Sequence, residues 1–416
     1  MKQKIIHIVK HPLFSGSAVM VIGTNLNNVI NYIYHVFMGR MLGPVAYGEM
    51  ASLFSLIVLV GTVPASINLA VVKYVSSMKN KQELSGFLSW IMKKSVILGI
   101  VISLIALGFS KYLQEFLKIR SLLPVIILSA SFAILIPSTI LRSILQGLLK
   151  FNKLIATYLT ENIFKLIISI TFVLLGLSVS GSMLGILIAS GIGIGLSYIF
   201  SSAYLKNAHS NPVGLSKFIE YSFPVLLYSV ASTSLFSSDL LLVKHFFSAQ
   251  EAGTYAALST MGKIIVFGAS PVTGVMFPLV SKRKSDGENF HKIFWFGFLL
   301  IGFICVLMLT VYKTIPEFAV SLLYGNQYLY AAKLLFPFGL FIAFFTLVTY
   351  LVGFYLSVNH TKIVTILAGA AILQIIGIIL FHTSLLEVIT VSTVVTFACL
   401  ILLLALLKGK LVKITL

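Results

Sequence analysis

The chain has 416 residues, of which 58% are hydrophobic and only 10% are charged, and its mean hydropathy is +1.05. Soluble domains carry roughly 25% charged residues, so the composition excludes a soluble globular protein and indicates an integral membrane protein. The formal charge of +19 would also suit a nucleic-acid-binding protein, but the basic cytoplasmic loops of a membrane protein give the same excess.

Apolar stretches of about 20 residues recur along the chain, each long enough to cross roughly 30 Å of hydrocarbon as a helix. The first follows a basic start, but it is long and lacks a small-residue cleavage site, so we expect a retained helix rather than a signal peptide. The predicted fold class is all-α and polytopic, with twelve membrane helices at about 12–39, 46–75, 86–109, 122–147, 153–178, 181–205, 219–246, 251–280, 290–313, 331–357, 361–382 and 385–407.

The connecting loops carry Lys and Arg unevenly. With successive loops on alternate sides of the membrane, 20 basic residues fall on the side of both termini and 7 on the other, while Arg142, Lys165 and Lys263 stay within helices. This bias predicts a multi-pass protein of the cytoplasmic membrane whose N- and C-termini are cytoplasmic. The short loops offer no basic face with reachable polar or aromatic readers, so we expect no nucleic-acid partner.

The most polar and turn-rich connection lies near the middle of the chain. It predicts a cytoplasmic linker at residues 208–218 between two six-helix bundles, residues 1–207 and 219–416. A shift of 205 residues aligns 46–77 with 251–282 and pairs five identical residues, among them Gly48 with Gly253. Repeated halves are typical of carriers that rock one bundle against the other around a site at the midplane.

Several motifs give a family resemblance that covers nearly all of the chain. The sequence resembles the oligosaccharide flippase (polysaccharide transporter) family of the multidrug/oligosaccharidyl-lipid/polysaccharide superfamily. The motifs are Gly16-Ser17, Gly39-Arg40-Met41-Leu42-Gly43-Pro44 with Tyr47-Gly48, Gln146-Gly147 with Asn152-Lys153, and Asp239-Leu240-Leu241-Leu242 with Gly253-Thr254-Tyr255. Leu240 stands where this family often has a basic residue, which argues against a charge pair at that point.

The resemblance implies a flippase that moves a polyprenyl-pyrophosphate-linked oligosaccharide to the outer leaflet during polysaccharide biosynthesis. It also implies two bundles around a polar central cavity, as in multidrug and toxic compound extrusion (MATE) carriers, coupling to H⁺ or Na⁺, and polysaccharide-assembly proteins as partners beside the membrane lipids. No phosphate-binding loop, metal-ligand cluster or pair of catalytic acids stands out, so we expect neither an enzyme nor a bound cofactor. A cation-coupled multidrug exporter and a membrane scaffold that moves nothing remain the alternatives.

Charged residues inside membrane helices cost roughly 2.5–3.5 kcal/mol each on insertion scales, so they usually face a cavity or a partner. Lys165, Lys263 and Arg142 are predicted to meet the phosphates of the substrate, since cations replace the water that an anion loses in a cavity. Each has a structural alternative: Lys263 can pair with Asp239, and Arg142 can reach the cytoplasmic interface. Asp239 is a candidate coupling acid or a hydrogen-bonded structural acid.

Glu161 and Lys165 lie four residues apart with the acid first, the favourable order for a pair on one helix. Together with Tyr158 and Ser169 they form one polar stripe. We expect Lys165 to hold Glu161 when the cavity is empty and to turn to phosphate when it is filled, which gives Glu161 a coupling or gating role. A self-neutralising structural pair is the alternative.

The first helix has a polar face formed by Thr24, Asn28, Asn31 and His35 at spacings of four, three and four. Asn28 and Asn31 are predicted to bind sugar hydroxyls. His35 titrates near neutral pH in unperturbed form and is a candidate gating residue. Ordinary polar packing between membrane helices is the alternative for the whole face.

Overall fold

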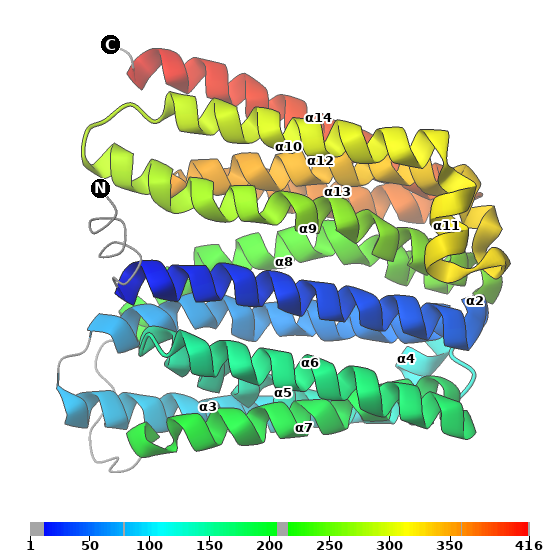
Figure 1. The fold of residues 1–416 in the computed structure, drawn as a ribbon, viewed down its shortest axis with the longest axis horizontal. Helices are drawn as coiled ribbons and strands as arrows, with labels where there is room; N and C mark the ends of the chain where they lie inside the picture. Colours follow the sequence, from blue (N-terminus) through cyan, green and yellow to red (C-terminus); the bar gives the residue numbers. More distant parts are fainter. Residues whose placement is uncertain (1–11, 78–79, 206–214, 359, 415–416) are drawn as a thin grey trace, which may run out of the picture. The chain divides into compact units, whose positions relative to one another are not determined.

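The computed structural model describes residues 12–77, 80–205, 215–358 and 360–414. Every regular element in these ranges is helical, which confirms the predicted fold class. The first half contains α2 (Pro12–Ser77), α3 (Lys81–Gly108), α4 (Ser110–Phe116), α5 (Leu123–Gly147), α6 (Phe151–Phe172), the π-helical turn η1 (Val173–Leu177) and α7 (Ser178–Leu205) (Figure 1). The second half contains α8 (Leu215–Phe246), α9 (Ala249–Ser285), α10 (His291–Thr314), α11 (Pro316–Tyr324), η2 (Asn326–Ala331), α12 (Ala332–Ser357), η3 (Thr361–Ile363), α13 (Val364–Leu380) and α14 (Leu385–Ile414).

Within these ranges, ten helical stretches are long and apolar enough to cross a membrane. Two of them, of 58 and 55 residues, would extend more than about 80 Å if straight, far beyond a bilayer. Each is interrupted by a glycine with positive φ, Gly43 at 71° in α2 and Gly176 at 86° between α6 and α7. The backbone reverses there at little steric cost because glycine lacks a Cβ atom. The two reversals divide the ten stretches into the twelve predicted spans.

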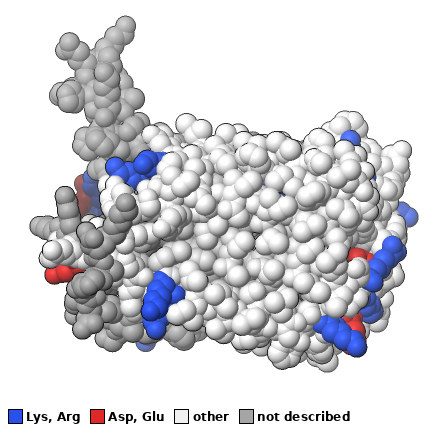
Figure 2. Space-filling view, turned by 90° about the horizontal axis from the view of Figure 1, so that it is seen from below, with Lys and Arg blue, Asp and Glu red and all other residues white. Residues whose placement is uncertain are grey.

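The surface fits a bilayer. Figure 2 shows Lys, Arg, Asp and Glu gathered toward two ends of the visible face, with an uncharged band between them. Large apolar side chains such as Leu174 and Phe296 are exposed on the helices. In water such a band would favour aggregation, whereas lipid chains solvate it.

The order of long and short helices is the same in both halves. A short helix follows the third long segment in each, α4 at residue 110 and α11 at residue 316. The interval of about 205 residues that aligns 46–77 with 251–282 therefore also relates these two short helices, which supports an internal repeat.

The chain divides into two compact units. The first comprises Met1–Leu42 and Leu56–Leu226, and the second comprises Gly43–Ser55 and Leu227–Leu416. The start of the second arm of α2 thus packs with the second unit, although the predicted boundary assigned it to the first bundle. Residues 206–214, which include most of the predicted linker, lie outside the described residues. The division into two six-helix bundles stays a prediction.

Two repeat-related glycines meet inside the second unit. A Cβ atom at Gly48 would lie 2.8 Å from the backbone nitrogen of Gly253, and one at Gly253 would overlap the carbonyl group of Pro44. Beside this contact the buried hydroxyl of Tyr47 hydrogen-bonds Thr260 Oγ1 at 2.8 Å and Tyr324 Oη at 3.3 Å. The backbones approach closely because neither glycine has a side chain, as is common where membrane helices cross.

Gly253→Ala is expected to destabilise the protein by roughly 1–3 kcal/mol, because the added methyl group meets backbone atoms that cannot rotate away. Thermal unfolding of the purified protein in detergent measures the effect. Gly274→Ala is the matched control, since it lies in the same helix and a Cβ atom there meets nothing within 4 Å. Equal melting temperatures for the two variants would contradict the close-contact explanation.

Candidate functional site

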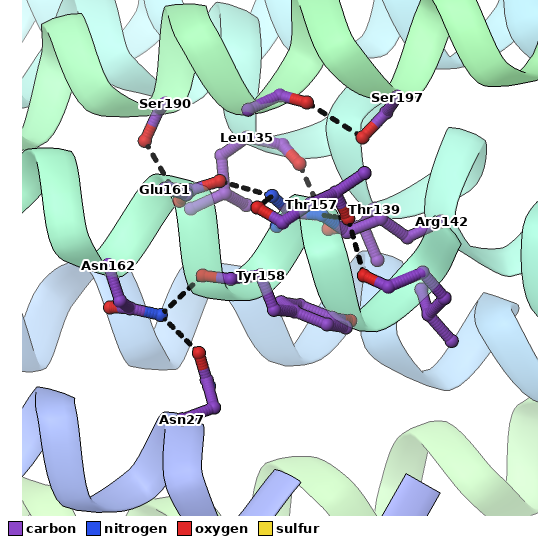
Figure 3. Close-up of polar contacts among 12 residues, drawn as sticks. Asn27, Leu135, Thr139, Arg142, Thr157, Tyr158, Glu161, Asn162, Ser190 and Ser197 are labelled. Carbon is purple, nitrogen blue, oxygen red and sulfur yellow. Dashed lines mark hydrogen bonds and ion pairs between the residues drawn. The ribbon is translucent and has the colours of Figure 1, made fainter. Parts of the chain in front are cut away.

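A partly buried ion pair lies between α5 and α6 of the first unit (Figure 3). Arg142 on α5 binds the carboxylate of Glu161 on α6, and Ser190 Oγ on α7 donates to the other Glu161 oxygen at 3.3 Å. The same guanidinium donates from Nε to Thr157 Oγ1 at 3.3 Å and lies 4.3 Å from the ring centroid of Tyr158. The pair ties three membrane helices together. Without it, the two charged groups would be desolvated and unpaired.

The structure corrects the predicted partner of Glu161. The spacing on one helix predicts a pair with Lys165, but the ion pair that forms is with Arg142, whose planar fork fits a carboxylate better than an ammonium does. A phosphate would have to displace Glu161 to reach the guanidinium, so Arg142 is a weaker substrate ligand than its sequence position indicates. Gly193 on α7 leaves room for the pair, since a Cβ atom there would lie 2.8 Å from Arg142 Nη2.

Lys165 turns instead toward the first arm of α2. Its ammonium donates to Asn31 Oδ1 at 2.6 Å and lies 4.7 Å from the ring centroid of Tyr34. The hydroxyl of Tyr34 in turn hydrogen-bonds Ser182 Oγ on α7 at 2.7 Å. Two predicted site residues, Lys165 and Asn31, are thus brought into direct contact.

The polar face of the first arm is rotated from the predicted one. Asn27 and Asn31 contact α6, where Asn27 Oδ1 accepts a hydrogen bond from Asn162 Nδ2 at 2.6 Å (Figure 3). Asn27 and Asn162 are the residues that the sequence analysis missed, although Asn27, Asn31 and Tyr34 repeat at helical spacing and so gave a signal. Asn28 is partly buried, and the buried ring of His35 packs edge-on against Tyr34 with centroids 5.4 Å apart.

These contacts form a polar column along α6. Thr157, Glu161, Lys165 and Ser169 follow one another at intervals of four residues, which places them over about 18 Å of helix length. Ser169 Oγ closes the column by donating to Ser182 O at 3.2 Å. The predicted stripe from Tyr158 to Ser169 is therefore a set of polar contacts with α2, α5 and α7.

The second unit holds a buried acid and a lysine that are bound separately. Asp239 on α8 is fully buried, and its carboxylate accepts from Tyr255 Oη at 2.6 Å and from the backbone N–H of Leu240 at 2.8 Å. Lys263 on α9 lies 6.0 Å and 5.9 Å from the ring centroids of Phe54 and Phe236. Among the residues that the structure describes, no carboxylate oxygen lies within 4.0 Å of this ammonium.

Lys263 therefore forms no direct ion pair with Asp239 among the described contacts, although the two opposite charges attract each other at longer range. Tyr255 takes the place of the lysine beside the acid, and the sequence signal for it was the Gly253-Thr254-Tyr255 triplet next to the repeat glycine. The Lys263 ammonium lies beside aromatic faces, which attract a cation without neutralising it. In the described ranges no group of three or more His, Cys, Asp and Glu side chains could hold a metal ion.

The repeated long helices define a polytopic membrane protein, and the solved structures that share this fold include those of transporters and a flippase. A multidrug resistance MATE family transporter of the MOP superfamily in an inward-facing conformation gives a TM-score of 0.78 at 11% identity, over 92% of this chain and 95% of that one. The lipid II flippase MurJ in an inward closed conformation gives 0.76 at 17% identity, over 94% and 87%. A MOP superfamily transporter from Pyrococcus furiosus gives 0.68 at 11% identity, over 96% of each chain.

The family model described as polysaccharide biosynthesis protein matches residues 37–333, and the chain belongs to that family. The predicted resemblance to a polysaccharide transporter family is thereby confirmed, and the chain has the fold of MOP superfamily transporters. No sequence among the curated proteins matches this chain.

Proposed function

We propose that this protein translocates a polyprenyl-pyrophosphate-linked oligosaccharide from the cytoplasmic to the outer leaflet of the cytoplasmic membrane by alternating access. Membership of a polysaccharide biosynthesis family supports a sugar-bearing substrate, and the fold shared with a lipid II flippase supports a lipid-linked one. The surplus of Lys and Arg on one set of loops supports cytoplasmic termini.

The observation that carries the proposal is the position of the Lys263 ammonium deep in the membrane, beside aromatic rings. It lies about 21 Å along α9 from Ala249, at a depth where an ammonium is costly, and it faces two aromatic rings of the described residues, with the charge of Asp239 acting on it from beyond ion-pair distance. An entering pyrophosphate supplies a negative charge in direct contact. Within the first unit, Lys165, which donates to the neutral amide of Asn31, is a separate candidate phosphate ligand.

The remaining candidate residues take roles that fit their chemistry. Asn31 and Asn28 present amides to sugar hydroxyls, which need both donors and acceptors. Asp239 is the leading residue for coupling to H⁺ or Na⁺, because its two hydrogen-bond donors are neutral and Lys263 acts on its charge only from beyond ion-pair distance. Glu161 and His35 are weaker coupling candidates, since Arg142 already compensates the acid.

Reconstitution of the purified protein into vesicles tests the proposal. With a fluorescent polyprenyl-pyrophosphate-linked oligosaccharide in one leaflet, we expect faster appearance of the label in the opposite leaflet than in protein-free vesicles. A membrane-impermeant quencher of the label measures that appearance. No acceleration would favour a scaffold for polysaccharide assembly, and movement of cationic dyes in its place would favour a multidrug exporter.

A further inference from the structure

An apolar groove of about 350 Å³ lies between α13 and α14 of the second unit. Its sides include Leu373 and Gly377 on α13 and Val391 and Val394 on α14. A Cβ atom at Gly377 would lie 2.7 Å from Val391 Cγ1, so the two helices meet along the floor of the groove. Leu373 and Val394 are both exposed. The groove therefore opens toward the lipid-facing surface and not toward the interior of the unit.

One end of the groove carries a carboxylate. Glu387, in the first turn of α14, belongs to the lining. Its Oε2 accepts hydrogen bonds from the backbone N–H and the hydroxyl of Thr383 at 2.6 and 2.7 Å, which fix the side chain in place. Its Oε1 accepts no hydrogen bond from the residues that the structure describes. One oxygen of the acid is thus held by the chain, and the other is available to a ligand.

The charge of Glu387 has no direct partner in the described ranges. Both donors to Oε2 are neutral, no Lys or Arg nitrogen lies within 4.0 Å of the carboxylate, and His382 acts on its charge only from beyond that distance. The hydroxyl of Ser384 lies beside the acid, where its oxygen accepts the Glu387 backbone N–H at 3.2 Å. This end of the groove therefore combines an anionic acceptor with a hydroxyl that can donate.

We propose that the groove binds a membrane lipid whose headgroup ends in an ammonium group, as in phosphatidylethanolamine. The ammonium donates to Glu387 Oε1, the hydroxyl of Ser384 donates to the neighbouring phosphate, and one acyl chain lies between α13 and α14. Binding pockets commonly combine such an apolar lining with a few polar groups that fix the orientation of the ligand. A small organic cation would leave the apolar lining unused.

The acid selects among the lipids that could fill an apolar groove. An anionic lipid would bring its negative headgroup against Glu387, and so would the pyrophosphate-linked lipid of the proposed function, whereas an ammonium forms a charge-assisted hydrogen bond there. The positive-inside bias assigns this end of α13 and α14 to the outer side, so the lipid belongs to the outer leaflet. The site does not depend on the proposed transport, since none of its residues belongs to the candidate translocation site.

Lipid binding to the purified full-length chain in neutral detergent tests the proposal. We expect dioleoyl phosphatidylethanolamine to raise the melting temperature saturably and to remain bound in native mass spectrometry, and dioleoyl phosphatidylglycerol to do neither. Glu387→Gln should weaken the apparent affinity about tenfold, the equivalent of one charge-assisted hydrogen bond, while the amide oxygen can still accept from Thr383. Glu317→Gln, which neutralises an exposed acid in the first turn of α11, is the matched control.

Equal binding of the two lipids, or equal losses in the two glutamine variants, would overturn the proposal. Val394→Trp fills the groove but keeps the acid, so it should also release the lipid, and Val306→Trp at an exposed position of α10 is its control. Unchanged lipid binding in Val394→Trp would place the lipid elsewhere and would equally overturn the proposal. Polyprenyl pyrophosphate provides the competing occupant. If it binds more tightly than phosphatidylethanolamine, the groove holds the tail of the transported lipid class and ammonium recognition is refuted.

Discussion

Glu161→Ala is expected to destabilise the first unit by roughly 3–5 kcal/mol, the largest stability effect that we predict. The substitution would leave the guanidinium of Arg142 in the membrane interior without its carboxylate, and breaking a buried pair costs more than the pair contributes. Thermal unfolding in detergent, followed by tryptophan fluorescence or circular dichroism, measures the change.

Two further variants separate the pair from simple loss of volume. The double substitution Arg142→Met with Glu161→Leu removes both charges and should recover most of the stability. Gly193→Ala should reproduce part of the loss with both charges present, because its methyl group would press on Arg142 Nη2 and the Glu161 carboxylate. Wild-type stability in Glu161→Ala would show that the two charges do not depend on each other.

Lys263→Met is expected to reduce transport of the lipid-linked oligosaccharide by about 10–100-fold, the largest functional effect that we predict. A charge-assisted hydrogen bond contributes roughly 1.5–3 kcal/mol, which corresponds to this range of affinity. Removal of a desolvated ammonium that has no acid within ion-pair distance among the described residues should leave the melting temperature unchanged or raise it. Lys263→Arg keeps the charge and should retain part of the rate in the vesicle assay.

Lys313 provides the matched control for this experiment. Its ammonium lies 5.7 Å from the ring centroid of Phe336 but at the exposed end of α10. Lys313→Met therefore removes a comparable contact with an aromatic ring without removing a buried cation. A phosphate-binding role for Lys263 is excluded if both variants transport at the wild-type rate, and a structural role is favoured if Lys263→Met melts early.

The twelve spans were predictable from sequence because the bilayer imposes a length and a composition on each. The predicted spans 122–147 and 290–313 agree within one residue with α5 (Leu123–Gly147) and α10 (His291–Thr314). The short helices α4 and α11 were not predicted. With 7 and 9 residues they are too short for a clear periodic signal, and they lie in connections that the hydropathy pattern treats as loops.

The partners of the buried charges were harder to predict. Helical spacing shows that Glu161 and Lys165 share a face, but it does not show which neighbouring helix approaches that face. Arg142 lies 19 residues before Glu161 on another helix. It can approach Glu161 because Gly193 on α7 has no side chain to occupy that space. The same limit applies to Asp239, whose partner Tyr255 is brought to it by the packing of α8 on α9.

The contact between Gly48 and Gly253 bears on how the two repeats evolved as well as on how they pack. These glycines occupy equivalent places in the two repeats, yet they touch each other. If one six-helix chain once paired with its own copy, this position faced itself across a two-fold axis, as residues at the centre of an isologous dimer interface do. In such a symmetric dimer, any single substitution of this glycine would have placed a side chain on both sides of the contact at once. Gene duplication would have freed each glycine to change alone, and both are still glycine.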